Sequence, residues 1–200
     1  MPGLLAVVHH AARVVTAHHP QSVLRVGDFS LEHGGPIPGH HSHQNGRDVD
    51  LGFYALDTRN RPVISSQFLA FDGAGQAVSS RGIRFDDARN WTLLNALLTN
   101  PRAEVRSIFV AFWLRTRLLR YGESIGSAKS VLERAAAIMM QPPNAEPHDD
   151  HFHIRIGCVQ SQRGTICRDD SRVPFNASHG PRPITPAEAA TDRLATSNGR

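Results

Sequence analysis

The histidines of this chain concentrate in two clusters, at residues 40–43 and 148–153, and no histidine lies between them. Three residues from these segments could do chemistry together: His43 and Asp50 from the first and His153 from the second. Two imidazoles and one carboxylate are a ligand set for a catalytic zinc ion, which leaves its fourth position to water. The pattern therefore predicts a metal centre suited to hydrolysis.

The second cluster has the pattern of a strand. In residues 151–156 histidine or arginine alternates with phenylalanine or isoleucine, and successive side chains of a strand point to opposite faces. The apolar residues are expected to face the core, while His151, His153 and Arg155 share the other face. One imidazole can then bind the metal while its neighbour acts on the water.

The first cluster combines a loop with a strand. Asp48 and Asp50 are expected on one strand face, with the apolar residues between and after them on the other. His43 lies in the preceding loop, and Gly46 permits the tight bend that would return it toward Asp50. A carboxylate often orients a histidine ligand from behind, and Asp48 or Asp149 could do so here.

Each feature also has a simpler interpretation. A histidine-rich loop can be a solvated surface, as we expect for the pairs at residues 9–10 and 18–19. Asp149 can belong to a turn, and Arg155 can hold a substrate carboxylate or form a structural ion pair. Two clusters that both direct polar groups away from an apolar face favour the metal centre.

Helices and strands are mixed along the chain without a regular alternation, which favours an α+β fold. We expect one domain over residues 1–170, with a central, mostly antiparallel sheet flanked by helices and the zinc site on one sheet face. Residues 171–200 are expected to form a flexible tail. The predicted helices cover residues 3–17, 113–121 and 127–140, and one further helix, which Asp86 or Asp87 can cap, runs through Leu98 until Asn100-Pro101 stops it. The predicted strands cover residues 22–29, 49–56, 62–71, 105–112 and the second cluster.

Composition limits the function further. The net charge of +4 favours polyanions, bacterial cell wall among them, but no basic run interleaved with aromatics supports nucleic-acid binding. No apolar run is long enough to span a membrane. The apolar run at residues 4–8 is too short for a signal peptide, so any export signal is expected upstream. Cys158 and Cys167 could close a disulfide loop or remain two separate thiols.

Two motifs resemble those of the penicillin-insensitive murein endopeptidases: Gly39-His40-x-Ser42-His43-Gln44-x-Gly46-x-Asp48-Val49-Asp50 and His148-x-x-His151-x-His153-x-Arg155. The resemblance implies a zinc centre with His43, Asp50 and His153 as its ligands, and we expect a single zinc ion per chain. It implies that His151 and His148 are catalytic and that Cys158 pairs with Cys167. The implied substrate is the D-alanyl–diaminopimelyl cross-bridge of peptidoglycan, cleaved in the periplasm or outside the cell.

Some members of that family hold a second metal through the first histidine of the loop and a later Asp and His. His40 matches the first of these, but the later histidine is absent, so His40 is assigned to a second metal or to a substrate contact. Three alternatives stay open: a D,D-carboxypeptidase or dipeptidase on stem peptides, a non-haem iron oxygenase, whose facial triad also has two histidines and a carboxylate, and a non-catalytic wall-binding module.

Overall fold

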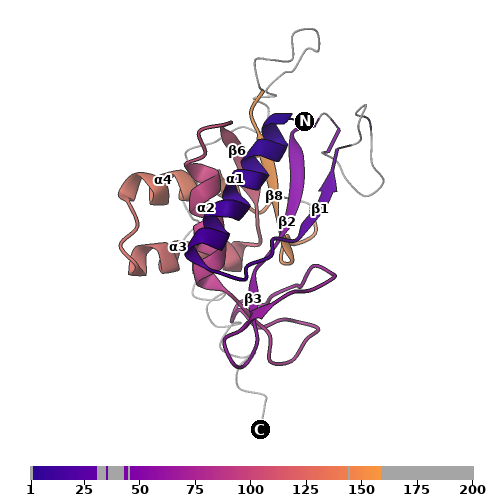
Figure 1. The fold of residues 1–200 in the computed structure, drawn as a ribbon, viewed down its shortest axis with the longest axis vertical. Coiled ribbons are helices and arrows are strands. Elements are labelled where there is room, and N and C mark those ends of the chain that lie inside the picture. The colour runs from indigo at the N-terminus through magenta and orange to yellow at the C-terminus, as the bar shows by residue number, and fades with distance from the viewer. Residues whose placement is uncertain (1, 31–34, 36–42, 45, 144, 159–200) are drawn as a thin grey trace. The chain divides into compact units, whose positions relative to one another are not determined.

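Within the described part of the chain, the fold combines four helices with a five-stranded and a three-stranded sheet (Figure 1). The computed structural model describes residues 2–30, 35, 43–44, 46–143 and 145–158. The helices are α1 (Pro2–His18), α2 (Asp87–Leu98), α3 (Phe112–Ser124) and α4 (Lys129–Ile138). The strands are β1 (Val26–Phe29), β2 (Asp48–Gly52), β3 (Ala55–Leu56), β4 (Pro62–Val63), β5 (Arg84–Phe85), β6 (Val105–Phe109), β7 (Met139–Met140) and β8 (His151–Ile156).

The larger sheet has the strand order β1-β2-β8-β6-β7. Its pairs are antiparallel except β6 with β7, which is parallel. The last described strand, β8, therefore lies at the centre, between β2 and β6. Its register places His153 opposite Asp50 of β2 and opposite Phe109 of β6. The predicted α+β fold with a mostly antiparallel sheet is confirmed.

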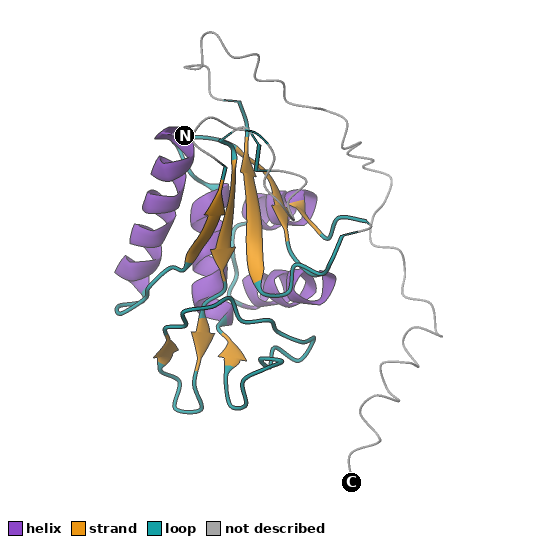
Figure 2. Ribbon diagram, turned by 90° about the vertical axis from the view of Figure 1, so that its right-hand side faces the viewer, coloured by secondary structure: helices purple, strands orange, loops and turns teal. Residues whose placement is uncertain are grey.

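One face of this sheet is apolar and is covered by the helices, which lie behind the sheet in Figure 2. Phe152, Ile154 and Ile156 of β8 are fully buried in the core that this packing forms. Their polar neighbours along the strand consequently point to the opposite face, as the alternation predicted. None of the described helices combines the length and apolarity that a bilayer crossing requires.

Two strands that the sequence predicted are divided or shortened in the structure, and their remaining parts contribute to the smaller sheet. The expected strand over residues 49–56 is interrupted after Gly52, because the side chain of Asn90 forms the hydrogen bonds of the Tyr54 backbone. Asn90 Oδ1 accepts from the Tyr54 N–H at 2.9 Å, and Asn90 Nδ2 donates to the Tyr54 carbonyl at 2.8 Å. The strand expected over residues 62–71 is only Pro62–Val63. It ends early because a local turn follows, in which the hydroxyl of Ser65 accepts from the Gln67 N–H.

The helical layer follows the predictions more closely. Asp86 caps α2 by accepting a hydrogen bond from the Arg89 N–H at 3.0 Å. The strand expected over residues 105–112 ends at Phe109, and α3 begins at Phe112. That helix does not end at Gly122 but continues to Ser124. Gly122 packs against Trp91 of α2, where an added Cβ would come within 2.3 Å of the indole.

The predicted tail, residues 171–200, and Cys167 lie outside the described residues. The domain boundary near residue 170 and the Cys158–Cys167 disulfide therefore stay predictions. Cys158 itself lies at the end of the described chain, with its Sγ 3.7 Å from Nη1 of Arg47.

Candidate metal centre

The paired register of β2 and β8 brings the first two candidate ligands together. Asp50 and His153 face each other across the two strands, and Asp50 Oδ1 lies 3.1 Å from His153 Nδ1. The third candidate, His43, precedes β2 and places its Nε2 3.3 Å from the same carboxylate oxygen and 3.1 Å from His153 Nδ1. All three side chains are buried. They form a group that can hold a metal ion, as the sequence predicted.

A tight bend carries His43 back to the strand. Gly46 has φ +75°, the left-handed conformation that glycine adopts without penalty, which confirms the predicted bend. His43 also has a left-handed φ of +55°, which is uncommon for a residue with a Cβ. Its backbone N–H donates to Asp48 Oδ2 at 3.2 Å. The Asp48 carboxylate therefore holds the loop that carries His43 against β2.

Asp48 fixes the orientation of the His153 ring. Its Oδ1 lies 3.2 Å from His153 Nε2, and this contact leaves His153 Nδ1 directed toward Asp50 and His43. Arg155, opposite Asp48 in the register, donates to both carboxylate oxygens, at 2.8 and 3.1 Å. Of the two roles that the sequence left open for Arg155, the structure shows the ion pair. On the other side, the ring of Phe109 stacks on His153 with centroids 4.9 Å apart.

The electrostatics of the buried acids favour their charged forms. Burial raises the pKa of Asp48, but hydrogen bonds from His153 and Arg155 outweigh it and lower the pKa to about 2. Burial also raises the pKa of Asp50, but the imidazoles of His153 and His43 outweigh this effect and hold the pKa of Asp50 well below its usual range. The pKa of His153 is raised, because its two carboxylate contacts outweigh the effect of its burial.

His151 stands beside this group but is more open to solvent. Its Nε2 lies 3.5 Å from Asp50 Oδ1, while its Nδ1 lies 2.5 Å from Asp150 Oδ1. Asp150 thus orients His151 in the way that Asp48 orients His153. The neighbouring acid proposed for such a role, Asp149, accepts the N–H of Phe71 through its backbone carbonyl.

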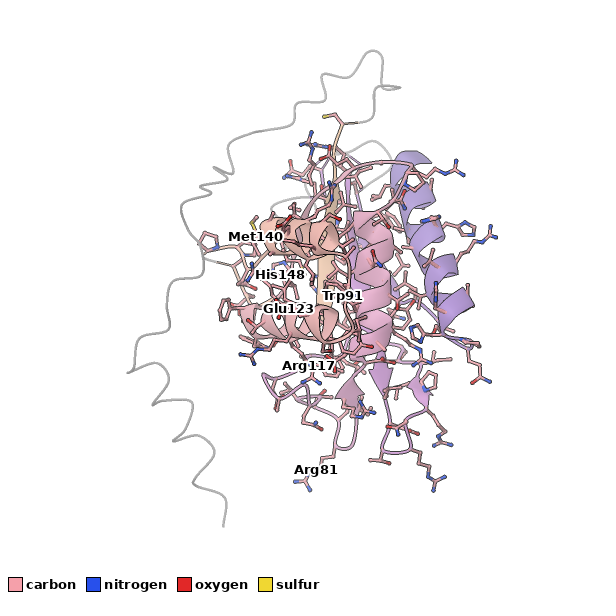
Figure 3. The ribbon with its side chains drawn as sticks, turned by 90° about the vertical axis from the view of Figure 1, so that its left-hand side faces the viewer. Arg81, Trp91, Arg117, Glu123, Met140 and His148 are labelled. Atoms are coloured by element: carbon pink, nitrogen blue, oxygen red, sulfur yellow. The ribbon has the colours of Figure 1, made fainter. Side chains whose placement is uncertain are left out.

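His148 completes the polar surface next to the metal group. Its ring centroid lies 5.3 Å from that of His151 and 6.1 Å from that of His153. Two backbone hydrogen bonds anchor it: its N–H donates to Gln141 Oε1, and its carbonyl accepts from the Ala111 N–H. Burial and the two neighbouring imidazoles lower its pKa to about 4. Figure 3 shows His148 beside the helical layer, near the ends of α3 and α4.

The structure thus brings together five candidate residues from both clusters, together with Asp48 and Arg155 behind them. His40 lies outside the described residues, so its assignment stays a prediction. Sequence reasoning missed Asp150, Phe109 and also Phe68, whose ring stacks on His151 with centroids 5.2 Å apart. The two aromatics carried no chemical signal in the sequence. Asp150 stands directly before His151, but the sequence did not distinguish it from Asp149 as the partner of that histidine.

Comparison with known proteins agrees with this geometry. A family model described as penicillin-insensitive murein endopeptidase matches residues 1–180, which include every residue of the site. The comparison with curated proteins gives no match.

Proposed function

The chain belongs to the penicillin-insensitive murein endopeptidase family, whose members are peptidases that act on the peptidoglycan of the cell wall. From this premise we propose that it is a zinc-dependent enzyme that hydrolyses D-alanyl–diaminopimelyl cross-bridges, and that it works in the periplasm or after secretion. The ligands would be His43, Asp50 and His153, with one zinc ion per chain.

The observation that carries the metal assignment is the triangle of ligand atoms. Its three edges are 3.1, 3.1 and 3.3 Å. A tetrahedral centre with bonds of ~2.0–2.1 Å to N and O ligands has ligand–ligand edges of about 3.3 Å. Asp50 Oδ1 is buried and accepts no well-oriented hydrogen bond within the described part of the chain. A buried carboxylate oxygen with two imidazole nitrogens at this spacing fits zinc.

The proposed chemistry divides between the metal and the chain. When bound, zinc would activate a water molecule and polarise the scissile carbonyl. His151 would accept the proton of that water at Nε2, since Asp150 holds its other nitrogen and directs Nε2 toward the centre. The same nitrogen would later return a proton to the leaving amine. His148, which is half-buried and lies beside His151, would hydrogen-bond the substrate next to the reacting carbonyl.

The proposal is tested by digesting purified cross-linked muropeptides and following the products by mass spectrometry. We expect conversion of dimers to monomers, inhibition by a chelator and recovery on addition of zinc. Loss of a terminal residue alone would instead identify a carboxypeptidase. Zinc binding without any turnover of dimers would contradict the proposed activity and favour a wall-binding module.

A further inference from the structure

A row of three residues crosses the site-bearing face of the sheet, beginning at His151. Gly52 of β2 lies opposite His151 in the register, and on its other side its N–H donates to the Arg25 carbonyl at 2.9 Å. Arg25 comes directly before β1. Neighbouring strands lie ~4.8 Å apart, so the Cα atoms of Arg25 and His151 are separated by roughly 10 Å.

An aromatic ring fills the middle of this row. Gly52 has no side chain, and an added Cβ there would lie 2.8 Å from the ring of Phe68 and 3.1 Å from the Cβ of Arg25. The ring stacks on His151 with an interplanar angle of 26°. The guanidinium carbon of Arg25 lies 6.0 Å from the ring centroid. Phe68 is therefore shared by His151 and Arg25, which places the guanidinium on the same face as the metal group.

The side chain of Arg25 is exposed and forms no ion pair or hydrogen bond within the described part of the chain. It lines a cavity of about 210 Å³ together with Gly52, Phe68 and the aliphatic residues Val63 and Leu69. An available guanidinium next to an apolar wall suits a ligand that carries a carboxylate on an aliphatic chain.

We infer that Arg25 binds a free carboxylate of the murein stem peptide, close to the bond that is cleaved. This inference rests on the proposed function and adds a substrate contact to it. The separation of roughly 10 Å corresponds to about three residues of extended peptide. Two groups fall within this reach, the free carboxyl of the diaminopimelyl residue and the α-carboxyl of the D-glutamyl residue, and both offer the same chemistry.

The test compares muropeptide dimers that carry both free carboxyls with dimers amidated at one or the other. We expect one amidation to lower kcat/KM of the wild-type enzyme about 10- to 100-fold, the range for losing a hydrogen bond to a charged group. The effect should lie mainly in KM, and the amidation that produces it identifies which carboxyl is bound. In the Arg25→Gln variant all dimers should be cleaved equally poorly, and Arg25→Lys should recover part of the preference.

The matched control is Arg120→Gln, which removes the same charge from an exposed position on α3, in the helical layer behind the sheet. It should retain the wild-type preference. An Arg25→Gln variant that still prefers the free carboxylate as strongly as the wild type would overturn the inference. Unchanged zinc content and melting temperature would show that the variant is folded.

A binding measurement separates this inference from the proposed function, because it requires no turnover. Calorimetry with uncross-linked stem peptides should show that the wild type binds the free acid more tightly than the amide, and that Arg25→Gln does not. Equal binding of acid and amide by the wild type would overturn the inference even if dimers are cleaved. If no dimer is cleaved but Arg25-dependent binding of the acid persists, the endopeptidase proposal fails and the carboxylate contact stands.

Discussion

His153 and His151 lie two residues apart on one face of β8, yet they belong to two different regions of the molecule. His153 belongs to the ligand region, which consists of His43, Asp48, Asp50, His153 and Arg155. His151 belongs to the rim, which consists of Phe68, His148, Asp150 and His151. Four of the five residues of the ligand region lie on β2 or β8, where strand register and a bidentate ion pair fix them, and only His43 lies in a loop. In the rim only His151 lies on a strand, and its residues are more exposed.

This difference suggests a division of work within the site. A metal centre needs ligands that are held in fixed positions, and the hydrogen-bonded pair β2 and β8 holds most residues of the ligand region in this way. The residues of the rim are partly exposed to solvent, so a substrate can contact them. If the division is correct, substitutions in the two regions should separate metal binding from turnover.

The largest effect is expected from His153→Ala. This change removes one ligand and leaves the charges of Asp48 and Asp50 without their shared partner, so we expect zinc content and activity to be lost together. Zinc is measured by mass spectrometry of the purified protein and activity by cleavage of dimers. The control is His9→Ala, an exposed position on α1, which should retain both. A zinc-loaded, active His153→Ala variant would contradict the ligand assignment.

His151→Ala is expected to keep zinc and lose turnover. The loss of a general acid–base group should lower kcat about 10²- to 10⁴-fold. Zinc affinity should stay close to that of the wild type, because Nε2 of His151 lies outside the three-atom ligand group. Loss of zinc from this variant would remove the proposed distinction between the two regions.

The two orienting carboxylates sharpen the comparison. Asp48→Asn should weaken zinc affinity about 10- to 100-fold, because it removes the charged partner of His153 and Arg155. Asp150→Asn should reduce kcat by a similar factor while leaving zinc affinity unchanged, because it contacts only the rim. Competition with a chromophoric chelator measures the affinities. Equal effects of both variants on zinc affinity would show that the regions are one unit.

The smallest effect on the site is expected from a change in the helical layer. Gly122→Ala would crowd the Trp91 ring and should lower the free energy of unfolding by about 1–3 kcal/mol. Zinc content and turnover below the melting transition should remain as in the wild type. Gly73→Ala is the matched control, since its added Cβ would meet its nearest neighbour at 3.8 Å, an ordinary contact. Thermal unfolding of both variants measures the difference.

The parts that the sequence predicted well are those in which a local pattern determines the structure. The strict alternation in β8 assigned the two faces correctly, since every second residue is an aliphatic or aromatic core residue. The capped start of α2 was likewise visible, because Asp86 is a good N-cap residue. Strand ends were predicted poorly where distant groups decide them. The break after Gly52 depends on Asn90, which is remote in sequence.

The same distinction explains what was found and missed in the site. Histidine and aspartate side chains are common metal ligands, so His43, Asp50 and His153 could be selected from the sequence before their distances were known. Phe68 could not be selected, because its importance arises from the missing side chain of Gly52 and from the position of His151, two tertiary features. Choosing between Asp149 and Asp150 as the partner of His151 also required the path of the loop.

The central position of β8 has a consequence for the order of folding. Until this strand is made, β2 and β6 have no partner on their facing edges, and His43 and Asp50 have no third ligand. His43 and His153 are 110 residues apart in the chain, and such distant contacts form slowly. A growing chain would thus carry no functional hydrolase until β8 has been synthesised and inserted between β2 and β6.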